Sequence, residues 1–198
     1  VDGVALDNLA RWDGTRWNAM DGGIDGSVYE LAGTSNDLFI GSSNNQQVET
    51  SAAASPQAVE DGHHPLSTWN GSTLSSFGNA NTMGINGIIS AILVDGSDMY
   101  VGGNFNFAGA TPANNVARWD GSAWHALGDG VEVFGRGDFG QGGGAEALGL
   151  TPIVYALAMV SGDLYVGGNF DIAGGQLIND LAIWDGNSWS GLPEPLTG

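Results

Sequence analysis

The sequence has no cysteine and no lysine, and these absences exclude several classes of function. Without cysteine the chain has no disulfide, no thiolate metal site and no cysteine nucleophile. Four arginines stand against 22 acidic residues, which gives a formal net charge of −18. Such a surface repels nucleic acid and anionic membranes, and it favours cations or basic partners. We therefore expect no nucleic-acid partner.

Long apolar runs and helix-period segments are also lacking. No run of about 18 apolar residues is present, so we expect no membrane insertion. Hydrophobic residues make up 42% of the 198 residues and charged residues only 13%, a balance typical of a folded chain. The 34 glycines suit many tight turns. The composition therefore indicates an ordered chain built from strands and turns.

One short hairpin motif is written four times. The copies are Trp12-Asp-Gly-Thr-Arg-Trp17, Trp69-Asn-Gly-Ser-Thr-Leu74, Trp119-Asp-Gly-Ser-Ala-Trp124 and Trp184-Asp-Gly-Asn-Ser-Trp189. Asp-Gly and Asn-Gly between apolar runs predict a tight turn, because these residues adopt positive φ at little cost. The two Trp positions of a copy then share one face of the ribbon. We expect all seven tryptophans to form the core of the repeat.

Two further apolar runs precede each later copy of the hairpin. The first is of the Val-Tyr-Ala-Leu type, as at Ile153–Met159, and the second of the Leu-Tyr-Val-Gly-Gly type, as at Leu164–Gly168. One unit therefore has four short strands. The first Trp recurs at intervals of 57, 50 and 65 residues, and four-stranded repeats of this length are typical of propeller blades. The alternative, a β-sandwich, leaves the repetition unexplained.

The strand count gives about three and a half blades. Residues 1–26 supply only the third and fourth strands of a unit, and complete units are expected at 27–77, 88–127 and 153–192. A closed propeller typically has four to eight blades. Further chain, another copy or a larger parent protein would supply the missing strands. We expect a larger parent, because proteins usually cover exposed sheet edges.

The repeat resembles a known family of propellers. Its pattern is Leu-Tyr-Val-Gly-Gly-Asn-Phe-x-x-Ala-Gly, followed by Asn-x-(Leu/Val)-Ala-x-Trp-Asp-Gly-x-x-Trp. It is similar to kelch-like repeats of large secreted bacterial proteins and fungal cell-surface markers, and distantly to the central propeller of galactose oxidase. The resemblance implies a secreted or cell-surface adhesive or scaffolding module. The unit at 27–77 departs from it at Gly41-Ser42, at Leu74 and in a long insert.

Two insertions, at 42–65 and 128–152, are expected to lie on one face of the propeller and to form its binding face. The candidate residues are Asp61, His63, His64, Arg136, Asp138 and Phe139. Histidine and carboxylate are competent metal ligands, but neighbouring residues of an extended strand point in opposite directions. A solvated loop is thus the favoured interpretation of the first insert. The Arg-Gly-Asp tripeptide in the second is favoured as a chance match.

Calcium is a weak candidate ion, because Asp and Asn oxygens are abundant in the turns. The candidate ligands are Asp95, Asp98 and Asp171. Turn formation explains each of them more simply. Asn70 is the only glycosylation acceptor of the Asn-x-Ser/Thr form.

Catalysis finds little support in the residue types present. Copper chemistry of the galactose oxidase kind needs a cysteine, and no Gly-x-Ser-x-Gly elbow is present. We therefore expect a non-catalytic structural or protein-interaction module without a cofactor, whose partners are other subunits or further copies of itself. The alternative is a carbohydrate-binding propeller, aided by calcium, in which exposed aromatic rings stack on glycans.

Overall fold

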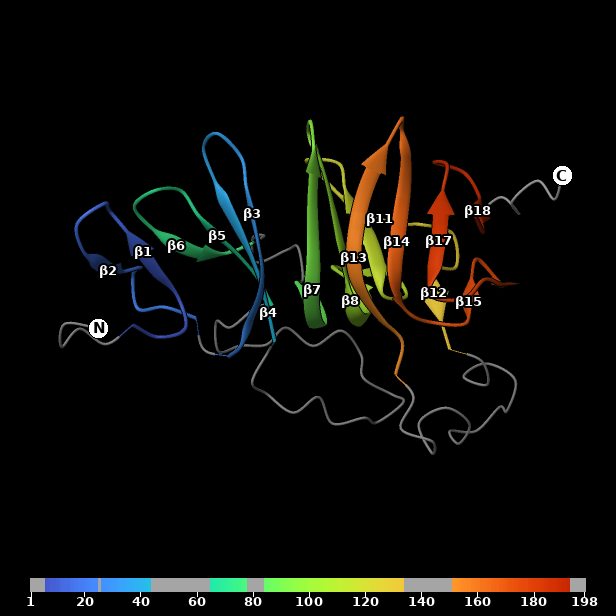
Figure 1. Cartoon of the computed structure of the whole chain (residues 1–198), viewed down its shortest axis with the longest axis horizontal. Coiled ribbons are helices and arrows are strands. Elements are labelled where there is room, and N and C mark those ends of the chain that lie inside the picture. The colour runs from blue at the N-terminus through green and yellow to red at the C-terminus, as the bar shows by residue number, and fades with distance from the viewer. Residues whose placement is uncertain (1–5, 25, 44–64, 78–83, 134–150, 193–198) are drawn as a thin grey trace, which may run out of the picture.

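The computed structural model describes residues 6–24, 26–43, 65–77, 84–133 and 151–192, and every regular element in these ranges is a β-strand. All strand pairs are antiparallel. The strands form one ribbon and several sheets, which lie side by side in chain order (Figure 1). The all-β prediction is therefore confirmed.

The N-terminal half of the chain contains a two-stranded ribbon and a first four-stranded sheet. The N-terminal ribbon consists of β1 (Ala10–Trp12) and β2 (Trp17–Ala19). Sheet I consists of β3 (Val28–Gly33), β4 (Leu38–Ser42), β5 (Leu66–Trp69) and β6 (Leu74–Ser76), paired in chain order.

The C-terminal half repeats the four-stranded arrangement twice. Sheet II consists of β7 (Ile85–Asp95), β8 (Asp98–Ala108), β10 (Val116–Trp119) and β11 (Trp124–Ala126), with β9 (Thr111–Pro112) beside β8. Sheet III consists of β13 (Ile153–Val160), β14 (Asp163–Asn169), β17 (Leu181–Trp184) and β18 (Trp189–Ser190). The strands of sheets I and III lie within the expected ranges 27–77 and 153–192, whereas β7 of sheet II begins at Ile85, three residues before the expected range 88–127.

A small additional sheet was not foreseen. Strands β12 (Val131–Glu132), β15 (Ile172–Ala173) and β16 (Gln176–Leu177) pair with one another. The segment 128–152 was expected to be a loop, and the strand at Val131–Glu132 corrects that expectation for these two residues. They form a strand because Val131 is fully buried and pairs with Ala173, 42 residues later in the chain.

The Asp-Gly hairpins are built as the sequence predicts. Trp119 lies directly opposite Trp124, and their ring centroids are 5.4 Å apart. In the turn between them, Asp120 Oδ1 accepts hydrogen bonds from the backbone amides of Ser122 and Ala123, both at 2.8 Å. Gly121 has a φ of +94°, which only glycine adopts without strain. Local turn chemistry therefore sets the register of these two strands.

Neighbouring sheets pack closely because glycine occupies the second strand. A Cβ at Gly41 of sheet I would lie 2.8 Å from Ile89 Cγ2 of sheet II. A Cβ at Gly102 of sheet II would lie 2.9 Å from Val154 Cβ of sheet III. Ile89 and Val154 are fully buried. The N-terminal ribbon and sheet III lie at opposite ends of this row (Figure 1).

Candidate interaction surfaces

Six of the residues singled out for binding lie outside the described part of the chain. Asp61, His63 and His64 belong to the segment 44–64, and Arg136, Asp138 and Phe139 to the segment 134–150. Their role as a binding face stays a prediction.

The described ends of the two insertions are connected across the sheets. Ser43, at the start of the first insertion, forms a β-bridge with Ile88. Ile88 pairs with Asn104 across β7 and β8. Asn104 Nδ2 donates a 2.7 Å hydrogen bond to the carbonyl of Pro152, which ends the second insertion. The end of β4, where the first insertion begins, and the start of β13, where the second ends, therefore both lie on the lower edge of the sheets in Figure 1.

The three weak calcium candidates lie at turns or between short strands in the described residues, and their role as ion ligands stays a prediction. Asp95 and Asp98 face each other across the turn between β7 and β8. Asp98 also forms an ion pair with Arg118 on β10, with a nitrogen–oxygen distance of 3.6 Å. The backbone amide of Asp171 donates to the Glu132 carbonyl at 2.9 Å, which joins β12 to β15. In the parts of the chain that the structure describes, no group of three or more His, Asp or Glu residues is placed to hold a metal ion.

The turn aspartates are strong hydrogen-bond acceptors on the surface. The Thr15 hydroxyl, the Arg16 amide and the Asn18 side chain hold the pKa of Asp13 well below its usual range. The Ser122 hydroxyl, the Ala123 amide and His125 do the same for the pKa of Asp120. Most of these bonds come from the turn itself, and those of Asn18 and His125 come from the strand that follows it. The lowered pKa values therefore arise from hydrogen bonds within each hairpin.

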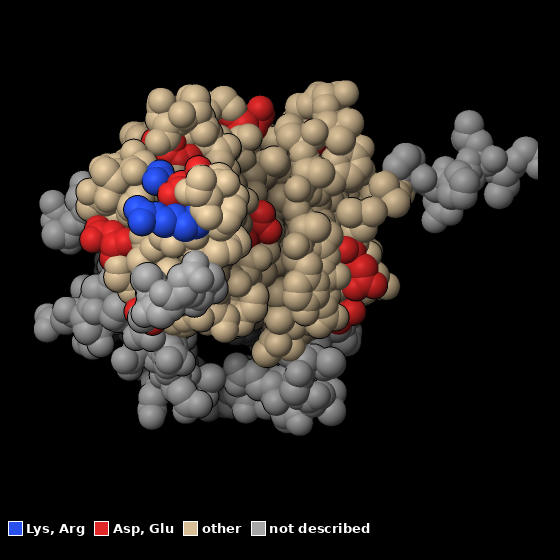
Figure 2. Space-filling model, turned by 60° about the vertical axis from the view of Figure 1, so that its left-hand side comes forward, with Lys and Arg blue, Asp and Glu red and all other residues tan. Residues whose placement is uncertain are grey.

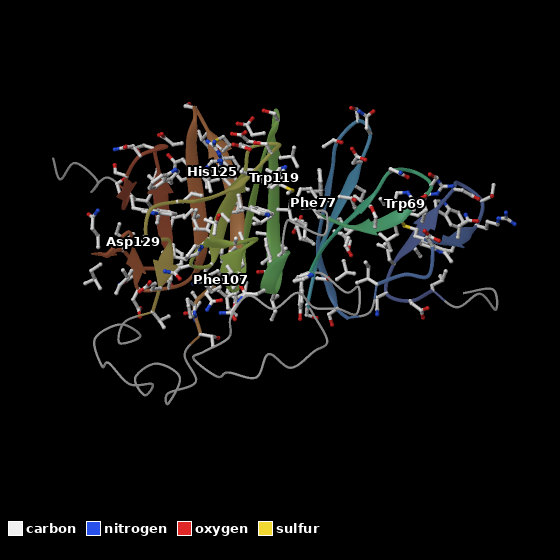
Figure 3. The ribbon with its side chains drawn as sticks, turned by 180° about the vertical axis from the view of Figure 1, so that it is seen from behind. Trp69, Phe77, Phe107, Trp119, His125 and Asp129 are labelled. Atoms are coloured by element: carbon white, nitrogen blue, oxygen red, sulfur yellow. The ribbon has the colours of Figure 1, made fainter. Side chains whose placement is uncertain are left out.

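The tryptophan pairs of sheets II and III pack against the preceding sheet. Phe77, which follows β6 of sheet I, lies 5.3 Å from Trp119 and 6.0 Å from Trp124 in edge-to-face arrangements (Figure 3). Trp189 of sheet III donates its indole N–H to the carbonyl of Leu127 at 2.7 Å. Leu127 follows β11 of sheet II, so the contact repeats from one interface to the next.

Trp12 and Trp17 correct the expectation that every repeat tryptophan is a core residue. Their rings pair at 5.5 Å, but their side chains are 50% and 44% exposed. The equivalent Trp124 and Trp189 are buried. The difference arises because no described residue takes the place that Phe77 and Leu127 have in the later interfaces. One face of the N-terminal ribbon is therefore an uncovered apolar surface.

The last sheet has a matching uncovered face on its other side. Met20, Phe77 and Leu127 occupy equivalent positions after the fourth strand, and each packs against the next sheet. Leu192 takes this position after β18 and is 57% exposed. Gly167 is the equivalent of Gly41 and Gly102, yet a Cβ there would meet nothing closer than 3.8 Å. Sheet III thus ends in a surface that the other sheets bury.

Basic charge is concentrated at the N-terminal end of the molecule. Arg11 and Arg16 on the N-terminal ribbon are both exposed. Figure 2 shows the basic side chains of this face gathered in one small area, with acidic groups spread around and beyond it. The chain is acidic overall, so this small area is a local exception to its surface charge.

Comparison with known proteins adds no further constraint. No protein-family model, curated protein sequence or solved structure matches the chain. Among the described residues there is no helix long and apolar enough to cross a membrane.

Proposed function

We propose that the chain is part of a kelch-like β-propeller that acts as a non-catalytic structural and protein-interaction module of a larger assembly. The extracellular or cell-surface location included in this proposal rests on the resemblance of the repeat. The interaction role rests on the two ends of the sheet row.

The main observation in its favour is that side chains exposed at each end of the row have buried or half-buried equivalents inside it. Trp12 and Trp17 are uncovered at one end, and Leu192 and Gly167 at the other. Trp124 and Leu127, in the same repeat positions, are buried between sheets. A single large side chain gains about 1.5–3 kcal/mol on full burial. These two surfaces therefore favour association with further sheets.

The first test is the intact mass and the oligomeric state of the native protein, by mass spectrometry and light scattering. We expect a polypeptide well above 20.3 kDa or a stable assembly of smaller chains. A lone 20.3 kDa monomer at high concentration would contradict the interaction role.

A pair of variants then tests whether the uncovered face of sheet III is the contact. Leu192→Asp places a charge on that face, whereas Leu177→Asp changes a still more exposed leucine on the β15–β16 hairpin, 74% against 57%. We expect the first to weaken association and the second to leave it unchanged. Equal effects would indicate nonspecific hydrophobic association.

Carbohydrate binding is the second candidate, and the exposed aromatic pair is the observation in its favour. Trp12 and Trp17 present indole rings to solvent, and aromatic rings bind the apolar faces of sugars. The two rings are inclined at 56°, so they do not form one flat platform. Glycan-array binding that is lost in Trp12→Ala and Trp17→Ala would favour this function over assembly.

A further inference from the structure

An asparagine or aspartate precedes the third strand of three units and has the same unusual backbone. Asn8, Asn115 and Asp180 have φ values of +58°, +66° and +62°. In sheet II, Asn115 is 1% exposed and connects two segments. Its Nδ2 donates to the carbonyl of Val131 at 2.7 Å, and its Oδ1 accepts from the amide of Phe105 at 3.2 Å. Phe105 lies on the second strand of the same sheet.

Asn8 makes only one of the two side-chain hydrogen bonds that Asn115 makes. Its Nδ2 donates to the carbonyl of Ile24 at 3.0 Å, just as Asn115 does to Val131. The amide of Ile24 donates to the Asp7 carbonyl at 2.8 Å, which reproduces the bond from Val131 to Asn114 at 3.1 Å. No group in the described part of the chain donates to Asn8 Oδ1. Asn8 is exposed because the strand equivalent to β8 is missing beside β1.

The backbone groups of Asn8 also lack the second-strand partners that Asn115 and Asp180 have. In sheet II the amide of Asn115 donates to the Phe105 carbonyl at 2.9 Å, and its carbonyl accepts from Gly103 at 3.0 Å. Asp180 repeats both bonds in sheet III, with Phe170 and Gly168, at 3.0 and 2.9 Å. The amide of Asn8 instead bonds to the carbonyl of Leu6, two residues back.

The positive charge on β1 also matches that on β10, the equivalent third strand of sheet II. Arg118 on β10 lies opposite Tyr100 and forms its ion pair with Asp98, both on β8. Arg11 takes the position of Arg118 on β1, is exposed, and has no ion-pair partner among the described residues. An incoming strand with aspartate at the position of Asp98 would supply one.

Given the interaction role proposed above, on which this inference rests, we propose that the open edge of β1 binds a partner β-hairpin with the first- and second-strand sequence of this repeat. Its second strand reads Asp-(Leu/Met)-Tyr-Val-Gly-Gly-Asn-Phe and pairs antiparallel with β1. Its Phe amide donates to Asn8 Oδ1, and its aspartate pairs with Arg11. The register follows β8 on β10, where Ala117 lies opposite Val101. Ala10 therefore lies opposite the valine of the partner.

A second copy of the described chain is not the occupant. In sheets I, II and III the second strand already pairs on both sides, with the first and the third strand. A copy would have to open one of its own sheets to supply a second strand. The edge therefore fits a hairpin that has no third and fourth strands of its own.

The test uses the full 198-residue chain and a synthetic hairpin of residues 153–170, which spans β13 and β14. Both that peptide and a scrambled control carry the same three-lysine tag, so charge attraction is matched. Binding is followed at about 150 mM salt, where charges are screened beyond roughly 8 Å. The readouts are tryptophan fluorescence, since Trp12 and Trp17 are exposed, and light scattering for stoichiometry. We expect one peptide per chain and no binding of the scrambled control.

Two substitutions of Asn8 separate the loss of the Oδ1 acceptor from other effects of changing this residue. Asn8→Ala removes Oδ1, and we expect binding about tenfold weaker, the effect of one lost hydrogen bond. Asn8→Asp loses the same Nδ2 bond to Ile24 as Asn8→Ala but keeps a side-chain oxygen, and it should bind within about twofold of the unchanged chain. A peptide with Gly168→Val should fail, because a Cβ at Gly168 would lie 2.9 Å from Val154 Cα of the hairpin itself.

Absence of peptide binding, or equal binding by Asn8→Ala and the unchanged chain, would overturn the strand site. If the chain still assembled through a contact sensitive to Leu192→Asp, the interaction role would stand without this site. A chain that stays monomeric and does not bind the peptide would contradict both proposals.

Discussion

At the scale of single residues, the hairpin turns depend on one side-chain oxygen more than on its charge. Asn70 Oδ1 accepts from the amides of Ser72 and Thr73 at 3.0 and 2.9 Å. Asp120 Oδ1 makes the equivalent pair of bonds with Ser122 and Ala123. A neutral amide thus builds the same turn. The negative charge of the aspartates strengthens bonds that geometry already provides.

The turn aspartates predict how stability falls in acid. The pKa values of Asp13, Asp120 and Asp185 are lowered in the folded chain by hydrogen bonds from hydroxyl and amide groups. Their stabilisation is present above the unfolded pKa of about 3.9 and is lost as the pH falls toward the folded value. We expect the triple variant Asp→Asn at these positions to lose less stability between pH 5 and pH 2, on the order of a few degrees in Tm. Parallel curves for Tm against pH would contradict this.

Removing the buried side chain of Asn115 is expected to destabilise the chain strongly. Asn115→Ala leaves the amide of Phe105 and the carbonyl of Val131 without their side-chain partner. We expect a loss of about 2–4 kcal/mol in the free energy of unfolding, since each unsatisfied buried group costs roughly 1–3 kcal/mol.

The control for Asn115 is Asn115→Gly, because glycine accepts the φ of +66° without strain. Comparing both variants by urea unfolding separates the lost hydrogen bonds from backbone strain. A loss below about 0.5 kcal/mol in Asn115→Ala would show that the two side-chain hydrogen bonds of Asn115 contribute little.

At the scale of elements, the close approach of neighbouring sheets depends on a glycine in each second strand. Gly102 and Gly167 occupy the same position of successive sheets, and neither has a positive φ. They differ in their surroundings, because Val154 covers Gly102 and no described residue covers Gly167. This makes them a matched pair for measuring the sheet interface.

Gly102→Ala should destabilise the chain, and Gly167→Ala should not. The new Cβ at position 102 would force β13 away from β8, and overpacking of this kind costs about 1–3 kcal/mol. At position 167 the nearest atom is 3.8 Å away, so we expect a change within about 0.5 kcal/mol. Urea unfolding of the two variants measures the difference. Equal losses would mean that the backbone conformation, and not the interface, requires glycine.

At the scale of the whole molecule, the charge of −18 acts on every sheet at once. Of the four arginines, Arg118 and Arg16 form ion pairs with Asp98 and Asp13. The remaining acidic charge repels itself across a compact chain, and repulsion of this kind opposes folding. Salt therefore has a predictable effect on the stability of the chain.

We expect Tm to rise with sodium chloride between about 10 and 150 mM, as the screening length falls from roughly 30 to 8 Å. A rise of about 2–4 °C corresponds to roughly 1 kcal/mol in a chain of this size. Calcium and magnesium chloride at equal ionic strength are the control, because both screen equally. A larger rise with calcium alone would indicate a specific calcium site, and a fall of Tm with salt would contradict the repulsion.

Much of the local structure could be predicted from the sequence. The Asp-Gly and Asn-Gly turns define the hairpins, since their hydrogen bonds join residues two or three positions apart. The apolar runs before them correctly indicated the four strands of each sheet. The strands β12, β15 and β16 were missed because each is two residues long, and β12 exists only through its pairing with the distant β15.

The burial of the tryptophans is a property that the sequence could not predict. Trp12 and Trp119 stand in nearly the same motif, yet only the second lies against a phenylalanine of another sheet. The motif by itself determined that each pair would meet across a hairpin, because the turn sets the register. Which pairs are buried was decided by the order in which sheets stack. Burial depends on the neighbour that covers a side chain, and a repeat at the end of the row has none on one side.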